Sequence, residues 1–103
     1  MRGPEYDGFT WDEEKSERCR RERGFGFEDA AKIFEDGFIE AEDRRRDYGE
    51  LRFVTIGQVD DVVLSVVWTP RENLRRIISA RPASRAERNR YYGERETYQQ
   101  RDP

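Results

Sequence analysis

Residues 51–79 read LRFVTIGQVDDVVLSVVWTPRENLRRIIS and contain three short apolar runs separated by polar turns. The runs cover 51–56, 62–68 and 74–79 and are rich in valine and isoleucine, which favour strands. The middle run is apolar at nearly every position, so it predicts a central strand covered on both faces. Glycine, proline, aspartate and asparagine occupy the stretches between runs, as is typical of hairpin connections. The segment therefore predicts an antiparallel meander.

Two helices are predicted before this meander. Residues 12–23 begin with acidic residues and end with arginines, which complements the helix dipole, and Gly24 follows as a stop. Residues 27–36 place four apolar residues on one helical face, which predicts a helix that covers the sheet. Residues 38–41 add a candidate short strand.

After the meander, Ser84 and Glu87 form a capping box that predicts a third helix of roughly ten residues. The predicted fold is α+β, a small antiparallel sheet of about four strands with two N-terminal helices and a C-terminal helix. We expect a single domain over 9–93, a disordered lead-in over 1–8 and a flexible tail over 94–103.

Charge is distributed unevenly along the chain, whose net charge is -3. Residues 1–43 hold 14 acidic and 7 basic side chains, whereas residues 71–95 hold 3 acidic and 8 basic ones. A local basic face matters more for binding phosphate than the total charge does, because salt screens distant charges. Eighteen of the 20 basic residues are arginine, which binds phosphate bidentately. A GC-rich genome would produce the same arginine bias.

The chain has no histidine and one cysteine, Cys19. Serine and cysteine nucleophile triads and zinc sites are therefore poorly supported, and an intramolecular disulfide is excluded. Asp60 and Asp61 are interpreted as a solvated turn, so we assign no metal and no cofactor. No apolar run is long enough to span a membrane and the N-terminus lacks a signal-peptide core. We expect a soluble, cytoplasmic protein without a membrane partner.

Arginine, carboxylate and tyrosine remain for catalysis, and they suit phosphodiester cleavage without a metal. In that reaction the ribose 2′-hydroxyl attacks its own phosphorus while the protein orients the phosphate, stabilises its charge and moves protons. Glu50 is a candidate proton acceptor, with Arg52 on the same strand face and Tyr48 nearby. The alternative is a surface Glu–Arg pair of little energetic consequence.

A collinear set of short motifs spans about residues 9–92. The motifs are Phe9-Thr10-Trp11-Asp12, Gly24 with Phe27-Glu28-Asp29-Ala30, Tyr48-Gly49-Glu50-Leu51-Arg52, Ile56-Gly57, Thr69-Pro70-Arg71, Arg76-Ile77-Ile78-Ser79-Ala80-Arg81 with Ala83, and Glu87-Arg88 with Tyr91. In this order and spacing they resemble the BrnT family of ribonuclease toxins. The resemblance implies a RelE-like fold and a ribonuclease activity that arrests translation.

The same resemblance implies a set of partners. A BrnA-like antitoxin with a ribbon-helix-helix part would neutralise the toxin by forming a heterotetramer with it. Operator DNA would be bound only through that antitoxin, and the substrate would be RNA.

The candidate site residues combine this resemblance with arginine chemistry. The catalytic candidates are Glu50, Arg52, Arg76 and Arg81. The RNA-binding candidates are Tyr48, Arg71, Ser79, Arg85, Arg88 and Tyr91. More ordinary alternatives stay open for several of them: Arg76 and Arg81 pair with acidic neighbours, Ser79 is a strand residue, and Tyr91 packs the last helix on the sheet.

The chain departs from the family pattern at residues that matter for proton transfer. Many members carry Lys-His where this chain has Glu22-Arg23, and a histidine shortly before Tyr48 is missing, with Arg46 near its place. Arginine replaces a charge but does not shuttle a proton. The second hypothesis is therefore a non-catalytic module on the same fold, which holds an antitoxin or nucleic acid.

Overall fold

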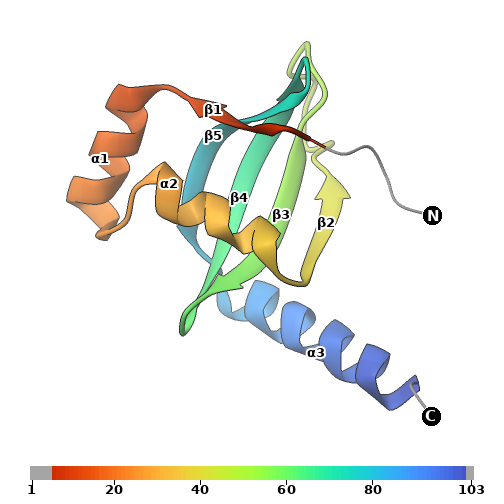
Figure 1. The fold of residues 1–103 in the computed structure, drawn as a ribbon. Coiled ribbons are helices and arrows are strands. Elements are labelled where there is room, and N and C mark those ends of the chain that lie inside the picture. The colour runs from red at the N-terminus through yellow and green to blue at the C-terminus, as the bar shows by residue number, and fades with distance from the viewer. Residues whose placement is uncertain (1–5, 102–103) are drawn as a thin grey trace.

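The computed structural model describes residues 6–101, with side chains up to Glu94. The elements follow in the order β1 (Gly8–Trp11), α1 (Glu13–Arg23), α2 (Phe27–Ala30), the 3-10 helix η1 (Ala31–Glu35), β2 (Phe38–Glu42), β3 (Phe53–Val59), β4 (Val62–Arg71), β5 (Leu74–Pro82) and α3 (Arg85–Arg101). The described strands form one five-stranded sheet in the order β1-β5-β4-β3-β2 (Figure 1).

The predicted α+β meander is confirmed, since β2, β3, β4 and β5 pair antiparallel in sequence order. The strands run further than the apolar runs alone indicated, because the hairpins close with tight turns. Asp60 and Glu72 take left-handed conformations there, with φ of 53° and 56°. Short polar side chains such as aspartate tolerate this region better than most residues do.

The sheet has one strand more than the predicted four. Gly8–Trp11 forms β1, which pairs parallel to β5, with Gly8 opposite Leu74 and Trp11 opposite Ile77. Residues 8–11 are too few to show a periodic pattern, and their partner lies far along the chain, so no local hairpin signal marks them. The sheet is consequently mixed at this edge.

The two predicted N-terminal helices are confirmed, although the second changes from α to 3-10 geometry at Ala31. Asp12 caps α1 by accepting a hydrogen bond from the backbone N–H of Glu14 at 2.9 Å, and Gly24 ends the helix with φ of 86°. Gly26 caps α2 without a side chain. Ser16 compensates from α1, since its buried hydroxyl accepts the N–H of Phe27 at 2.9 Å.

One face of the sheet is covered by α2 and η1, and α1 lies beside the β5 edge (Figure 1). The core between them includes Phe27, Ile33, Val66 and Trp68, all 2% exposed or less. At Gly57 a Cβ atom would lie 2.8 Å from the Cβ of Ile33, so glycine lets η1 approach β3 closely.

The opposite face is partly covered by α3. Tyr91 packs there with Ile56, Val63 and Ala83, and its hydroxyl donates to the carbonyl oxygen of Gly37 at 3.1 Å. α3 spans 17 residues, more than the ten predicted. Within the described residues, no helix is long and apolar enough to cross a membrane.

The predicted lead-in and tail overlap the described chain only in part. Residues 1–5 and 102–103 lie outside the described residues. The rest of the predicted lead-in includes the first residue of β1, and the rest of the predicted tail belongs to α3.

Candidate functional site

Most of the predicted site residues lie on the sheet face opposite α2. Leu64, Val66 and Trp68 of β4 point into the core under α2, so the alternate positions of that strand point the other way. On β5 their partners are Arg76, opposite Thr69, Ser79, opposite Val67, and Arg81, opposite Ser65. Alternation also puts Arg52 and Arg71 on this side. We call the face carrying Arg52, Arg71, Arg76, Ser79 and Arg81 the arginine face.

Glu50 lies between two guanidinium groups at one end of the arginine face. Arg52 donates from Nε to Oε2 of Glu50 at 3.0 Å, and Nη2 of Arg71 lies 3.7 Å from Oε1. The Glu50 side chain keeps 32% of its surface exposed, so substrate can reach it. The structure thus brings together Glu50, Arg52 and Arg71, which come from the β2–β3 loop and from the end of β4.

A buried carboxylate, Asp43, organises the loop that carries Glu50. Its side chain is 1% exposed and accepts two hydrogen bonds from Arg45, both at 2.8 Å, and one from the hydroxyl of Tyr48 at 3.0 Å. The hydrogen bonds from Arg45 hold the pKa of Asp43 far below its usual range, against the opposing effect of burial.

The loop then presents Tyr48 to Arg52. The guanidinium carbon of Arg52 lies 4.1 Å from the centre of the Tyr48 ring, within the range of a cation–π contact. Asp43 therefore positions Arg52 through Tyr48. Sequence reasoning missed Asp43 and Arg45, because in the sequence they are two members of a charged stretch from Glu42 to Asp47 with no periodicity.

Arg81 lies further along β5 and pairs with Glu87, the first carboxylate of α3. Its Nη1 and Nη2 donate to the two oxygens of Glu87 at 2.8 and 3.0 Å. Glu87 also accepts the N–H of Ser84 at 2.8 Å in the predicted capping box. These bonds, Arg81 first, lower the pKa of Glu87 to about 2, so Glu87 is ionised at neutral pH and holds Arg81.

The hydrogen bonds that Arg81 donates to Glu87 raise the pKa of Arg81, against the opposing effects of burial and of the positive charge of Arg45.

Arg76 differs from the other arginines of this face. Its Nη1 donates to the Thr10 hydroxyl of β1 at 3.2 Å, and among the described side chains it has no carboxylate partner. Its positive charge is therefore available to an anion. Ser79, the next outward-facing residue along β5, is exposed.

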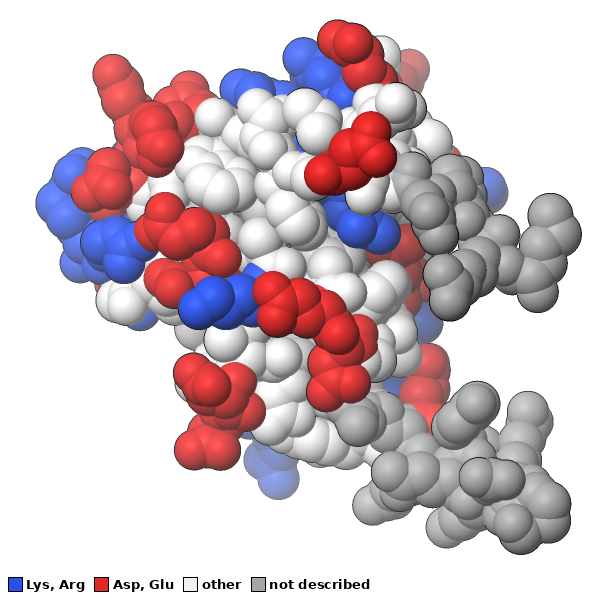
Figure 2. Space-filling model, viewed as in Figure 1, with Lys and Arg blue, Asp and Glu red and all other residues white. Residues whose placement is uncertain are grey.

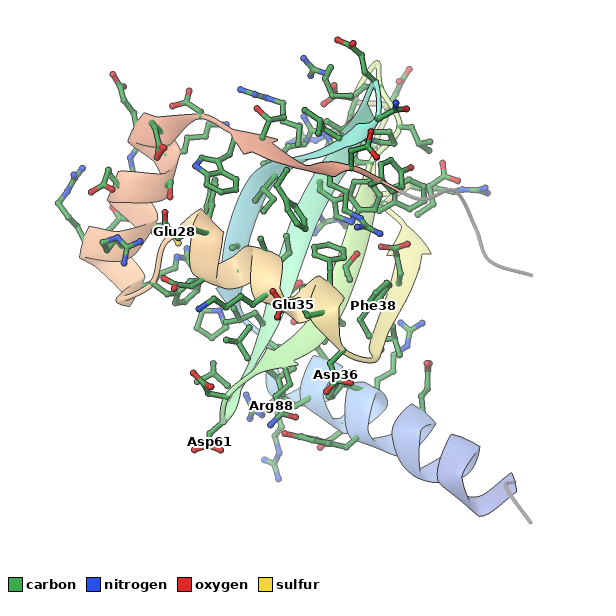
Figure 3. All side chains as sticks on the ribbon, in the orientation of Figure 1. Glu28, Glu35, Asp36, Phe38, Asp61 and Arg88 are labelled. Atoms are coloured by element: carbon green, nitrogen blue, oxygen red, sulfur yellow. The ribbon has the colours of Figure 1, made fainter. Side chains whose placement is uncertain are left out.

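The remaining candidates lie on α3. Arg85 is exposed, and Arg88 donates to the carbonyl oxygen of Ala83 at 2.9 Å; Figure 3 shows Arg88 near the start of this helix. Tyr91 is fully buried, as expected if it packs the last helix on the sheet. Its ring is therefore not accessible to an RNA base while α3 stays packed.

The side of the molecule covered by α2 and η1 carries many acidic side chains. Figure 2 shows them over these two helices, with acidic and basic side chains mixed over α1, and Figure 3 labels Glu28 on α2 and Glu35 and Asp36 at the end of η1. In the part of the chain that the structure describes, no three histidine, cysteine or acidic side chains group as metal ligands would.

The described elements define a small α+β protein with arginines and one exposed carboxylate on one sheet face. A family model described as "Ribonuclease toxin, BrnT, of type II toxin-antitoxin system" matches residues 11–87, and the chain belongs to this family. The resemblance drawn from its motifs is thereby confirmed.

Comparison with solved structures supports the fold. The chain is similar to the crystal structure of the Brucella abortus ribonuclease toxin, BrnT, with a TM-score of 0.57 and 22% sequence identity. The match covers 76% of this chain and 97% of that one. A search of curated proteins gives no significant match.

Proposed function

We propose that this ribonuclease toxin is an endoribonuclease that cleaves RNA without a metal ion and thereby inhibits translation. The observation that carries the proposal is the arginine face itself. An accessible carboxylate, Glu50, lies between Arg52 and Arg71, and Arg76 offers a charge that no described carboxylate neutralises. A base beside a cluster of phosphate-binding groups is what transphosphorylation requires.

The proposed reaction begins with RNA lying across the arginine face. Arg76 and Arg52 hold the non-bridging oxygens of the scissile phosphate, and Glu50 accepts the proton of the 2′-hydroxyl. The 2′-oxygen then bonds to phosphorus while the bond to the 5′-oxygen breaks, and the leaving oxygen takes a proton from solvent. The products are a 2′,3′-cyclic phosphate and a 5′-hydroxyl end.

Arg81 is proposed to bind the phosphate by exchanging Glu87 for a phosphate oxygen. In the structure its guanidinium is held by Glu87, so it contacts the phosphate only after that bidentate pair opens. Arg71, Ser79, Arg85, Arg88 and Tyr48 are proposed to bind RNA around the cleaved bond. We leave Tyr91 out of this group because it is buried.

Membership of a type II toxin-antitoxin family implies an antitoxin partner. We propose that it is BrnA-like, forms a heterotetramer with this chain, and is the part that contacts operator DNA. We further propose that the complex functions in the cytoplasm.

A second candidate function is a non-catalytic module on the same fold. The observation that favours it is the pairing of Arg81 with Glu87 and of Arg45 with Asp43, which removes two charges from phosphate binding. The chain also lacks a histidine to relay protons.

Induced expression separates the two candidates. The wild-type chain is expected to arrest growth, and Arg76→Ala is expected to abolish the arrest. Arg21→Ala is the matched control, because Arg21 is exposed on α1 among Glu13, Glu14 and Glu17, away from the arginine face. Unimpaired growth with the wild-type chain, expressed and folded, would reject the toxin proposal and leave the binding module.

A further inference from the structure

A second basic surface lies beside the arginine face, at the edge of the sheet. β1 pairs only with Leu74–Ile77, so the next residues of β5 face α1 instead. Between α1 and β5 is a groove of about 230 Å³, whose lining includes Lys15, Arg18 and Arg23 of α1 and Ser79 of β5. We call it the α1 groove.

Among the described residues, the cations of the α1 groove form no ion pair, although Arg18 also borders the surface lined by Glu13, Glu14 and Glu17. Lys15, Arg18 and Arg23 are exposed, and none of them forms an ion pair with a described carboxylate. Glu22 is the one acidic residue in the described lining, so the groove carries an excess of positive charge. On the arginine face, by contrast, Arg52, Arg71 and Arg81 are each paired with a carboxylate. The groove therefore offers an anion three cations that form no ion pair among the described residues, in addition to Arg76 on the arginine face.

The position of α1 beside β5 favours binding of an RNA phosphodiester over pairing of β5 with a further β-strand. Cys19 on α1 donates from Sγ to the carbonyl oxygen of Ala80 at 3.6 Å, so the helix already lies against the outward edge of β5. A further strand would have to displace α1 to reach that backbone. A chain of phosphates needs only the cationic side chains at the rim.

Ser79 connects the groove to the proposed catalytic surface. It lines the groove and also belongs to the outward-facing row of β5 that contains Arg76 and Arg81. The groove and the arginine face therefore meet at Ser79, so that one strand of RNA can contact both surfaces.

We propose that the α1 groove binds a backbone phosphate of single-stranded RNA next to the cleaved nucleotide, through Lys15, Arg18 and Arg23. This inference rests on the proposed ribonuclease function. It adds a site that fixes the substrate without taking part in bond cleavage.

The test measures RNA binding apart from cleavage. A short fluorescein-labelled single-stranded RNA with 2′-O-methyl riboses is not cleaved by attack of the 2′-oxygen, so its affinity reports binding alone. Affinity is measured against salt for wild type, for Lys15→Gln, Arg18→Gln and Arg23→Gln, and for the triple variant. Arg21→Gln is the matched control on the same helix. Thermal unfolding checks that each variant is folded, which is expected because the side chains are exposed.

Each groove substitution is expected to reduce the slope of log affinity against log salt by about 0.7, and the triple variant by about 2. At about 0.1 M salt the triple variant should bind roughly 100-fold more weakly, whereas Arg21→Gln should stay within about twofold of wild type. Cleavage of unmodified RNA by the triple variant should recover at saturating RNA.

Three results would overturn the inference. They are unchanged RNA affinity in the triple variant, an equal loss in Arg21→Gln, and weaker binding of the antitoxin with unchanged RNA binding. If wild type cleaves RNA and the triple variant binds RNA normally, the inference fails while the proposed function stands. If wild type binds the modified RNA through the groove but never cleaves unmodified RNA, the proposed function fails alone.

Discussion

Asp43 shows how much of the candidate site depends on a single buried charge. Burying a carboxylate with only 1% of its side chain exposed destabilises the fold unless its oxygens accept hydrogen bonds. Arg45 and Tyr48 donate those hydrogen bonds to Asp43. Tyr48 in turn supports Arg52, and Arg52 holds Glu50. The proposed base therefore depends on a residue that does not contact substrate.

The first prediction concerns this residue. Asp43→Asn should lower the free energy of unfolding by about 1–3 kcal/mol, because charge-assisted hydrogen bonds to Arg45 are lost in a buried position. It should also reduce kcat for RNA cleavage more than it raises KM, since Glu50 and Arg52 lose their positions. Asp47→Asn in the same loop is the control, because an amide oxygen can still accept the N–H of Gly49. Equal effects of the two substitutions on cleavage would contradict a positioning role.

A second prediction concerns the pH dependence of the Arg81–Glu87 pair. The pKa of Glu87 is about 2 in the folded chain and near its ordinary value of 4.5 in the unfolded chain, mainly because of the hydrogen bonds from Arg81, so ionised Glu87 stabilises the fold above about pH 5. This contribution is lost as the pH falls from about 5 to 2. Glu87→Gln should cost roughly 1–2 kcal/mol at pH 7, less than the full pKa shift corresponds to, because Arg81 is 43% exposed.

Denaturant unfolding at several pH values checks this prediction. The difference between wild type and Glu87→Gln should shrink toward zero near pH 2. A difference that stays constant with pH would assign the stability to the capping geometry of Glu87 rather than to its charge.

At the scale of elements, the sequence predicted those helices and strands that have a local pattern of apolar, capping or charged residues. The strands β3, β4 and β5 follow from dense apolar runs, and α1 follows from its capping residues and charge order. Arg76 and Arg81 are five residues apart, so strand alternation alone would place them on opposite faces. They share one face because the β4–β5 register shifts between Val67 and Trp68, which no local pattern indicated. β1 could not be predicted, because its four residues are recognised only by their pairing with distant β5. The pairing of Asp43 with Arg45 and Tyr48 is close in sequence but lies in an irregular loop, where no periodicity indicates which charges meet. The pairing of Glu87 with Arg81 depends on how α3 turns back onto β5.

The packing of η1 on β3 gives a third prediction. Gly57→Ala should destabilise the fold by about 1–3 kcal/mol, because the added methyl group would lie 2.8 Å from the Cβ of Ile33. Gly93→Ala is the matched control in α3, where a Cβ meets nothing within 4 Å. That change should stabilise the helix by up to about 1 kcal/mol. Thermal unfolding compares the two, and equal stability of Gly57→Ala and wild type would show that η1 can shift away from β3.

At the scale of the whole molecule, the cations that form no ion pair among the described residues are local features. Lys15, Arg18 and Arg23 line the α1 groove and Arg76 lies on the arginine face, whereas Figure 2 shows acidic side chains over α2 and η1. A net charge of -3 does not by itself oppose RNA binding, because salt screens distant charges more than it screens cations that contact the phosphate.

A toxin of this family is expected to have two partners, an RNA substrate and an antitoxin. RNA is proposed to use the arginine face and the α1 groove. An antitoxin that neutralises the chain needs only to cover one of these surfaces, so antitoxin and RNA should compete for binding.

Incubation of the purified chain with RNA in the presence of EDTA tests the central claim most directly. Wild type should cleave the RNA and leave 2′,3′-cyclic phosphate or 3′-phosphate ends, and Arg76→Ala should leave it intact at the same protein concentration. RNA that remains uncut at an excess of folded wild-type chain, with or without EDTA, would contradict the account. Cleavage that EDTA abolishes would support ribonuclease activity but would contradict a metal-independent mechanism.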